Sequence, residues 1–163
     1  MKAFVRVLAI AAGVMWAASA QAGASQVGNV YYEDIFPLST CMNSPSCFAV
    51  SSSATPAGVY VRMQHFYCRV TIQSSSPILQ GLSLQVWTAP PNSSGASKIK
   101  EVNLSFPPTL LSNGFNLYNV DHEILLVTGP GRYLVVSADI STIISGVITA
   151  VQCAITGDLI PPP

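Results

Sequence analysis

Charged residues are scarce in this sequence, and their scarcity excludes one class of partner. Asp, Glu, Lys and Arg make up 9% of the 163 residues, with seven acidic and seven basic side chains. No basic stripe or cluster is present that could neutralise the phosphates of a nucleic acid. We therefore expect no nucleic-acid partner. Abundant Val, Ile and Leu together with a low net charge also indicate a folded chain rather than a disordered one.

The sequence motifs of common enzymes and cofactor sites are missing. No G-x-S-x-G elbow, P-loop or dinucleotide-binding glycine pattern occurs, and histidine is present only at His65 and His122. These absences predict no catalytic residues, no metal site and no cofactor. A secreted hydrolase stays open as an alternative, because the members of a catalytic triad need not be neighbours in sequence.

The apolar run near the N-terminus, Val7 to Ala18, is too short to span the ~30 Å of a membrane's hydrocarbon core. Lys2 and Arg6 precede it, and two small-residue cleavage patterns follow it, ending at Ala20 and at Ala22. This layout predicts a secretory signal peptide over residues 1–22, with cleavage at one of these two alanines. We therefore expect a secreted or periplasmic protein with no transmembrane segment in its mature part.

Removal of the leader changes the charge of the chain. Lys2 and Arg6 leave with it, so five basic residues remain against seven acidic ones, a net charge of −2. Residues 23–158 are numerous enough for one domain with a substantial core. Residues 159–163 end in three prolines, which cannot extend a central strand, and form a predicted tail.

Four cysteines, Cys41, Cys47, Cys68 and Cys153, all follow the predicted leader. An even number in an exported chain predicts two disulfides, for which three pairings exist. We favour Cys41–Cys47, which closes a short loop of turn-forming Asn, Pro and Ser residues, and Cys68–Cys153, which joins two predicted strands. The alternative of a zinc site is not favoured, because the spacing differs from that of the usual zinc fingers.

The stretch Gly58 to Gln73 is the clearest strand signal. Apolar residues alternate with polar ones over its whole length, but they change parity at Gln64-His65. The alternating apolar positions are Val59, Val61 and Met63, followed by Phe66, Cys68, Val70 and Ile72. Such a parity change would turn the buried face outward unless one extra residue is accommodated there. The pattern therefore predicts a long strand with a β-bulge or bend at its middle.

Shorter strand signals occur along the rest of the chain, separated by turns. They cover Gln26 to Tyr32, Cys47 to Ser52, Leu82 to Thr88, Ile99 to Phe106, Ile124 to Val127, Tyr133 to Ser137 and Val147 to Thr156. Pro130-Gly131 suits the centre of a type II turn, and Ser141 to Ser145 is predicted as a turn or a short helical piece. Several short strands with little helix signal predict a single-domain antiparallel β-sandwich, Ig-like or jelly-roll-like, with two disulfides.

Candidate binding residues are aromatic. If exposed, three aromatic side chains could bind a glycan or a peptide by stacking on it: Trp87, Tyr60 and Tyr67. The alternative is that all three pack in the core or at its rim. The run Asp121-His122-Glu123 is acidic and contains a histidine, yet consecutive strand residues point to opposite faces. At most Asp121 and Glu123 can converge, so we interpret this run as solvated charge.

These observations predict an exported, non-catalytic binding module whose ligand is a glycan or another surface protein. The first alternative is a structural subunit of a bacterial surface fibre or adhesin. Assembly of a fibre by strand donation needs an unpaired sheet edge and a free strand, for which Gln21 to Ser39 is the available segment. Composition does not determine the oligomeric state.

Overall fold

The computed structural model describes residues 24–27, 31–74, 77–107, 110–112, 114–141 and 145–163. The predicted signal peptide over residues 1–22 lies outside the described residues, as do residues 142–144 of the predicted turn or short helix. In the part of the chain that the structure describes, no helix is long and apolar enough to cross a membrane.

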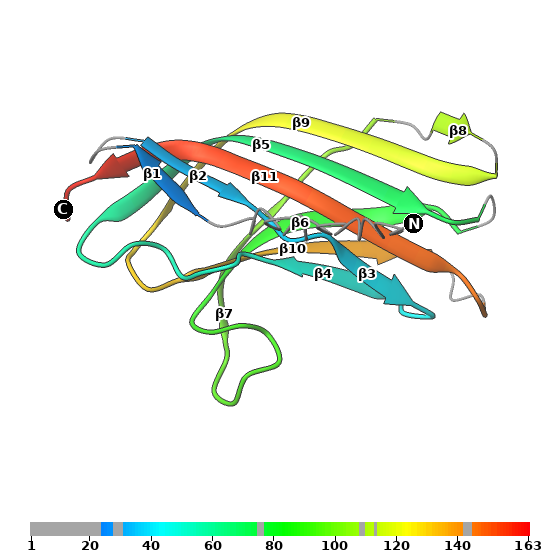
Figure 1. Cartoon of the computed structure of the whole chain (residues 1–163), viewed down its shortest axis with the longest axis horizontal. Helices are drawn as coiled ribbons and strands as arrows, with labels where there is room; N and C mark the ends of the chain where they lie inside the picture. Colours follow the sequence, from blue (N-terminus) through cyan, green and yellow to red (C-terminus); the bar gives the residue numbers. More distant parts are fainter. Residues whose placement is uncertain (1–23, 28–30, 75–76, 108–109, 113, 142–144) are drawn as a thin grey trace, which may run out of the picture.

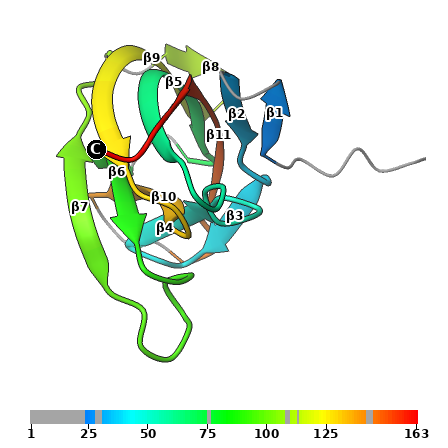
Figure 2. The same cartoon turned by 90° about the vertical axis from the view of Figure 1, so that its left-hand side faces the viewer.

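The protein is an all-β, two-layer structure of antiparallel sheets packed face to face (Figures 1 and 2). The larger sheet has the order β1-β2-β11-β5-β9-β8, and β3 pairs with β11 beside β2; the smaller has the order β4-β10-β6-β7. The larger sheet contains β1 (Ser25–Val27), β2 (Tyr31–Ile35), β3 (Ser39–Met42), β5 (Tyr60–Ile72), β8 (Leu110–Ser112), β9 (Phe115–Thr128) and β11 (Ile148–Ile160). The smaller sheet contains β4 (Ser46–Val50), β6 (Leu79–Trp87), β7 (Lys98–Asn103) and β10 (Tyr133–Ile140). The prediction of an antiparallel sandwich is confirmed.

Strand β5 is the long central strand that the alternation predicted, and its parity change is confirmed. Met63 and Phe66 are fully buried, whereas the two residues between them, Gln64 and His65, are both exposed. The inward residues of β5 supply much of the core between the two sheets, together with Tyr32 and the strands of the smaller sheet.

The irregularity at Gln64 extends across three neighbouring strands. Residues that pair on either side of it are Met63 with Gly157 and Leu126, and His65 with Thr156 and Glu123. Over this interval β5 therefore has one residue more than β11 and one fewer than β9. Burial alternates without a break along β11 and β9, whereas Gln64 and His65 of β5 are consecutive and both exposed, so the change of parity is confined to β5. Met63 and Phe66 thus both face the core although they lie on opposite sides of the irregularity.

Gly157 lies opposite Met63 of β5, where the backbone of β5 leaves no room for a side chain. A Cβ atom at this position would overlap the carbonyl oxygen of Arg62 and would lie 2.9 Å from the Cα atom of Met63. Because both are backbone atoms, they cannot move aside without distorting the bulge. We expect Gly157→Ala to lower the free energy of unfolding by roughly 2–3 kcal/mol, measured by urea denaturation.

Gly129→Ala is the matched control for this substitution. A Cβ atom at Gly129 would meet only the ring of Tyr60, at an ordinary contact distance of 3.5 Å. We expect a change of at most about 0.5 kcal/mol there, as for surface sites in general. Equal losses at the two glycines would contradict a special role for the close approach at Gly157.

Both predicted disulfides are present. Cys68 and Cys153 pair directly across β5 and β11 and are buried in the core. Cys41 and Cys47 join β3 of the larger sheet to β4 of the smaller one. The second bond therefore ties the two layers together on the side where the chain passes between them.

Several predicted boundaries are wrong. The first predicted strand is two antiparallel strands, β1 and β2. Strand β9 begins at Phe115, whereas the predicted strand began at Ile124. The first part of β9 was missed because its inward Asn116 interrupts the apolar pattern. The Asn116 amide donates to the carbonyls of Ser74 and Pro77 at 2.9 and 2.7 Å. Strand β11 continues to Ile160, past the predicted end at Thr156, and Gly157 pairs with Met63 at the shift in register.

Candidate functional site

The three aromatic residues predicted to bind do not share a surface. The Trp87 indole nitrogen donates to the Gln85 side-chain oxygen at 2.8 Å, which places both on the outer face of the smaller sheet. Tyr67 is 44% exposed on the outer face of the larger sheet. Tyr60 lies across the bulge on that same sheet, beside Gly129. Any binding role of these residues stays a prediction, but one ligand cannot contact all three at once.

The polar groups beside Trp87 are already engaged with one another. The Gln85 amide donates to Ser83 Oγ at 3.0 Å and to Glu101 Oε1 at 2.9 Å. The Lys98 ammonium donates to the other oxygen of Glu101 at 2.5 Å, and this hydrogen bond is the main reason that the pKa of Glu101 lies below its ordinary value. The face around Trp87 thus offers stacking area but few free hydrogen-bonding groups.

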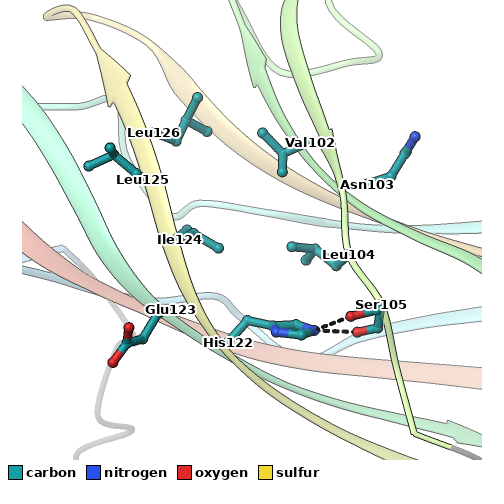
Figure 3. Close-up of a pocket in the computed structure, with 9 residues that line it drawn as sticks. All are labelled: Val102, Asn103, Leu104, Ser105, His122, Glu123, Ile124, Leu125 and Leu126. Carbon is teal, nitrogen blue, oxygen red and sulfur yellow. Dashed lines mark hydrogen bonds between the residues drawn. The ribbon is translucent and has the colours of Figure 1, made fainter.

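A hollow opens on the side of the sandwich formed by β7 and β9 (Figure 3). We call it the β7–β9 mouth and define it by residues Val102–Ser105 and His122–Leu126. Its volume is about 270 Å³. In Figure 3 the side chains of Val102, Leu104 and Ile124 point into the gap between the two segments, whereas Asn103, Glu123 and Leu125 point away from it. The mouth therefore has an apolar interior and a mainly polar rim.

Strand order explains why the sandwich is open here. In the described part of the chain, β7 pairs only with β6, and β9 beyond Leu117 pairs only with β5. The two edges belong to different sheets and are bridged by side chains in place of a backbone ladder. Lys100 Nζ donates to the carbonyl of Val127 at 2.9 Å, and His122 Nε2 lies 2.5 Å from the carbonyl oxygen of Ser105.

The pair of Ser105 and His122 resembles part of a hydrolase site only in residue type. His122 Nε2 lies 3.0 Å from Ser105 Oγ, but it also faces the Ser105 carbonyl oxygen, which can only accept a hydrogen bond. Nε2 must therefore carry a hydrogen and cannot at the same time take the proton of the hydroxyl. In this arrangement His122 joins two segments and does not activate Ser105.

The neighbours of His122 point to the opposite face, as strand alternation requires. Asp121 forms an ion pair with His65 Nε2 at 2.8 Å on the outer face of the larger sheet, and Glu123 is exposed on the same face. Among the residues that the structure describes, no three His, Cys, Asp or Glu side chains are placed to hold a metal ion.

Leu125 is the residue of this region that the sequence pattern did not single out. It is 82% exposed because it shares the outward face of β9 with Asp121 and Glu123, two and four residues before it. The available signal was the unbroken apolar run Ile124–Val127, which violates the alternation of the rest of the strand.

Alanine substitutions at Leu125 and at its neighbour Leu126, which is 7% exposed, should have different effects on the free energy of unfolding. We expect Leu126→Ala to lower the free energy of unfolding by about 2–3 kcal/mol, through lost burial and a residual cavity. Leu125→Ala should change it by less than about 0.5 kcal/mol. Urea denaturation of both variants tests this, and a large loss for Leu125→Ala would show that its side chain has a structural role.

Comparisons with known proteins do not assign a function to this site. The chain matches no protein-family model, and no curated protein sequence shows significant similarity to it. The role of the mouth is therefore inferred from its geometry and chemistry.

Proposed function

We propose that this protein is an exported, non-catalytic binding module that holds another protein at the β7–β9 mouth. Two disulfides are typical of extracellular proteins and support export, as does the predicted leader. An apolar hollow with a polar rim is the usual form of a binding site.

The observation that carries the proposal is this hollow together with the exposed Leu125, which borders it and points to the outer face of the larger sheet (Figure 3). The exposed Leu125 side chain and the apolar interior adjoin an edge of β9 that has no strand neighbour among the described residues. Burial of a large apolar side chain in the centre of an interface contributes much of the affinity of protein complexes. A glycan, in contrast, needs many free polar groups, and those beside Trp87 are engaged internally.

A fibre subunit is less well supported than a binding module. The segment available for strand donation, Gln21 to Ser39, contains β1 and β2, and β2 pairs with β11 of its own sheet over Tyr31–Ile35. Donation to another copy would first require the loss of this pairing. The unpaired edge of β9 is common to both hypotheses, so they differ in what occupies it.

Selection from displayed peptide libraries tests the proposal. Linear and disulfide-closed libraries are selected on the residue 23–163 protein and counter-selected on two variants, Val102→Glu and Leu125→Ser. We expect clones that bind the unmodified protein at least about tenfold more tightly than either variant, a difference of about 1.4 kcal/mol. Leu125→Ser controls for folding, because this side chain is exposed. Clones that lose binding only with Trp87→Ala, or none at all, would overturn the proposal.

A further inference from the structure

We propose that the ligand of the mouth is an extended polypeptide segment that pairs as an added strand with β9 over Asn119–Glu123. The segment carries basic residues opposite Asp121 and Glu123 and an apolar residue between them, opposite His122. This inference rests on the proposed function and names the kind of partner that the site accepts.

Backbone direction along β9 is the first argument. Strand β8 pairs with β9 only over Phe115–Leu117, and the hairpin that joins them directs the amide and carbonyl groups of Phe115 and Leu117 toward β8. Alternate residues of an antiparallel strand direct these groups to the same side. Those of Asn119, Asp121 and Glu123 therefore point past the end of β8, where no strand of the described chain pairs with them.

Space beside this edge is the second argument. A hollow of about 460 Å³ lies between the Ser105–Pro107 segment and the β9 residues Asn119, Asp121 and His122, and it adjoins the mouth at Ser105 and His122. An added strand lies about 4.8 Å from its neighbour, so it needs such a gap along the edge. The unpaired stretch is short, because the bulge at Leu125 and the Lys100 contact with the Val127 carbonyl interrupt the edge beyond Glu123.

Charge determines which strand fits. Asp121 and Glu123 are exposed on the outer face of the larger sheet. On β5, Tyr67 lies opposite Asp121 and His65 opposite Glu123, and Arg69 is exposed on the same face opposite Asn119. In antiparallel pairs, opposite charges directly across from one another stabilise and like charges destabilise. The same edge of a second copy would place acidic residues opposite acidic residues. A partner strand with Lys or Arg at these two positions is therefore favoured over self-association.

The mouth determines the residue between the two basic ones. Side chains alternate along a strand, so the residue opposite His122 points toward the interior of the sandwich. It enters the hollow lined by Val102, Leu104 and Ile124, whose volume is about 270 Å³, when it displaces the contact between Ser105 and His122 at the border of that hollow. An apolar cavity of roughly 150 Å³ is sufficient for benzene, so a leucine or phenylalanine side chain can be accommodated here. The expected pattern is basic, apolar, basic.

A fluorescein-labelled nine-residue peptide with Lys-Leu-Lys at its centre and threonines on either side is the probe. Fluorescence polarisation measures its binding to the residue 23–163 protein. Backbone N-methylation provides a matched pair of controls. The amides of the two lysines would face β9, whereas the amide of the leucine would point away from it. We expect N-methylation of both lysines to weaken binding at least tenfold and N-methylation of the leucine to have less than a twofold effect.

A charge exchange on the protein tests the partner's chemistry. We expect Glu123→Lys to weaken binding of the Lys-Leu-Lys peptide at least fivefold and to strengthen binding of a Glu-Leu-Glu peptide. Glu123 is exposed, so the fold should be unaffected. Equal binding of both N-methylated peptides, or no response to Glu123→Lys, would overturn strand addition. A concentration-dependent dimer in sedimentation that the peptide dissociates would assign the edge to a second copy and would also overturn it.

Failure of this inference can be distinguished from failure of the proposed function. If the library selection yields clones that depend on Val102 and Leu125 but are insensitive to N-methylation and to Glu123→Lys, the mouth binds proteins in another way. If no clone depends on the mouth, the proposed function fails as well.

Discussion

Replacing Cys68 and Cys153 together with alanine is expected to lower the free energy of unfolding by about 4 to 5 kcal/mol. The two residues are 85 positions apart, so their bond closes a long loop in the unfolded chain. Loss of that constraint increases the conformational entropy of the unfolded state. Guanidinium denaturation of the oxidised protein and of the double variant, both without reductant, measures the difference.

The Cys41–Cys47 bond is the internal control. Its residues are six positions apart, and the same relation between loop length and entropy predicts a loss of only about 2 to 2.5 kcal/mol for the corresponding double alanine variant. The long-range bond should therefore cost about twice as much to remove. Equal losses would show that loop entropy is not the main contribution of either bond.

Replacing Asp34 with asparagine is expected to stabilise the protein by up to about 3 kcal/mol at about pH 7.5. Asp34 is fully buried; one carboxylate oxygen accepts a hydrogen bond from the Tyr32 hydroxyl at 3.1 Å, and the other has no partner among the described residues. Burial raises the pKa of Asp34 to about 6, and the hydrogen bond from Tyr32 lowers it by a smaller amount. Asparagine removes the buried charge while it keeps an oxygen that can accept the Tyr32 hydrogen bond.

The pH dependence of stability gives the sign of this effect. Because the pKa of Asp34 is raised from 3.8 to about 6 on folding, the folded state binds more protons than the unfolded state between these values. The contribution of Asp34 is therefore fully present below about pH 4 and is lost as pH rises through about 6. The difference in unfolding free energy between the unmodified protein and Asp34→Asn should follow this curve. A difference that is independent of pH would contradict it.

Tyr32→Phe provides a second check on the same buried pair. This variant removes the hydroxyl that donates to Asp34, so the remaining carboxylate loses the hydrogen bond that lowers its pKa. We expect a stronger destabilisation above about pH 6 than below about pH 4. An equal loss at both pH values would indicate that the hydroxyl contributes only by packing.

The predictions that held depend on patterns within a few residues of the chain. The parity change at Gln64-His65 predicted the bulge because side chains alternate with a period of two along any strand. Cys68 and Cys153 could be paired because each lies on the apolar face of a predicted strand. The pair Pro130-Gly131 predicts a turn, and Gly131 has the positive φ that such a turn needs, 67°.

The predictions that failed involve polar residues on inward faces. Asn116 of β9 and Asp34 of β2 are both almost completely buried. Asn and Asp are depleted in strands and are usually exposed, so a sequence pattern does not place them on an inward face. The carbonyls of Ser74 and Pro77 that accept hydrogen bonds from Asn116 are more than 35 residues away from it in sequence. No local pattern contains that information.

By itself, the sequence determined the β content, the position of the bulge and the pairing of the cysteines, because each depends on short-range alternation or on the number of cysteines. Only the tertiary structure decided which strands became edges, that Trp87 and Tyr67 lie on different sheets, and that β7 and β9 enclose a mouth. Strand order is set by backbone pairing between distant segments, and the backbone groups that form those pairs are the same in every residue except proline. The proposed binding edge therefore has no signature in the linear sequence.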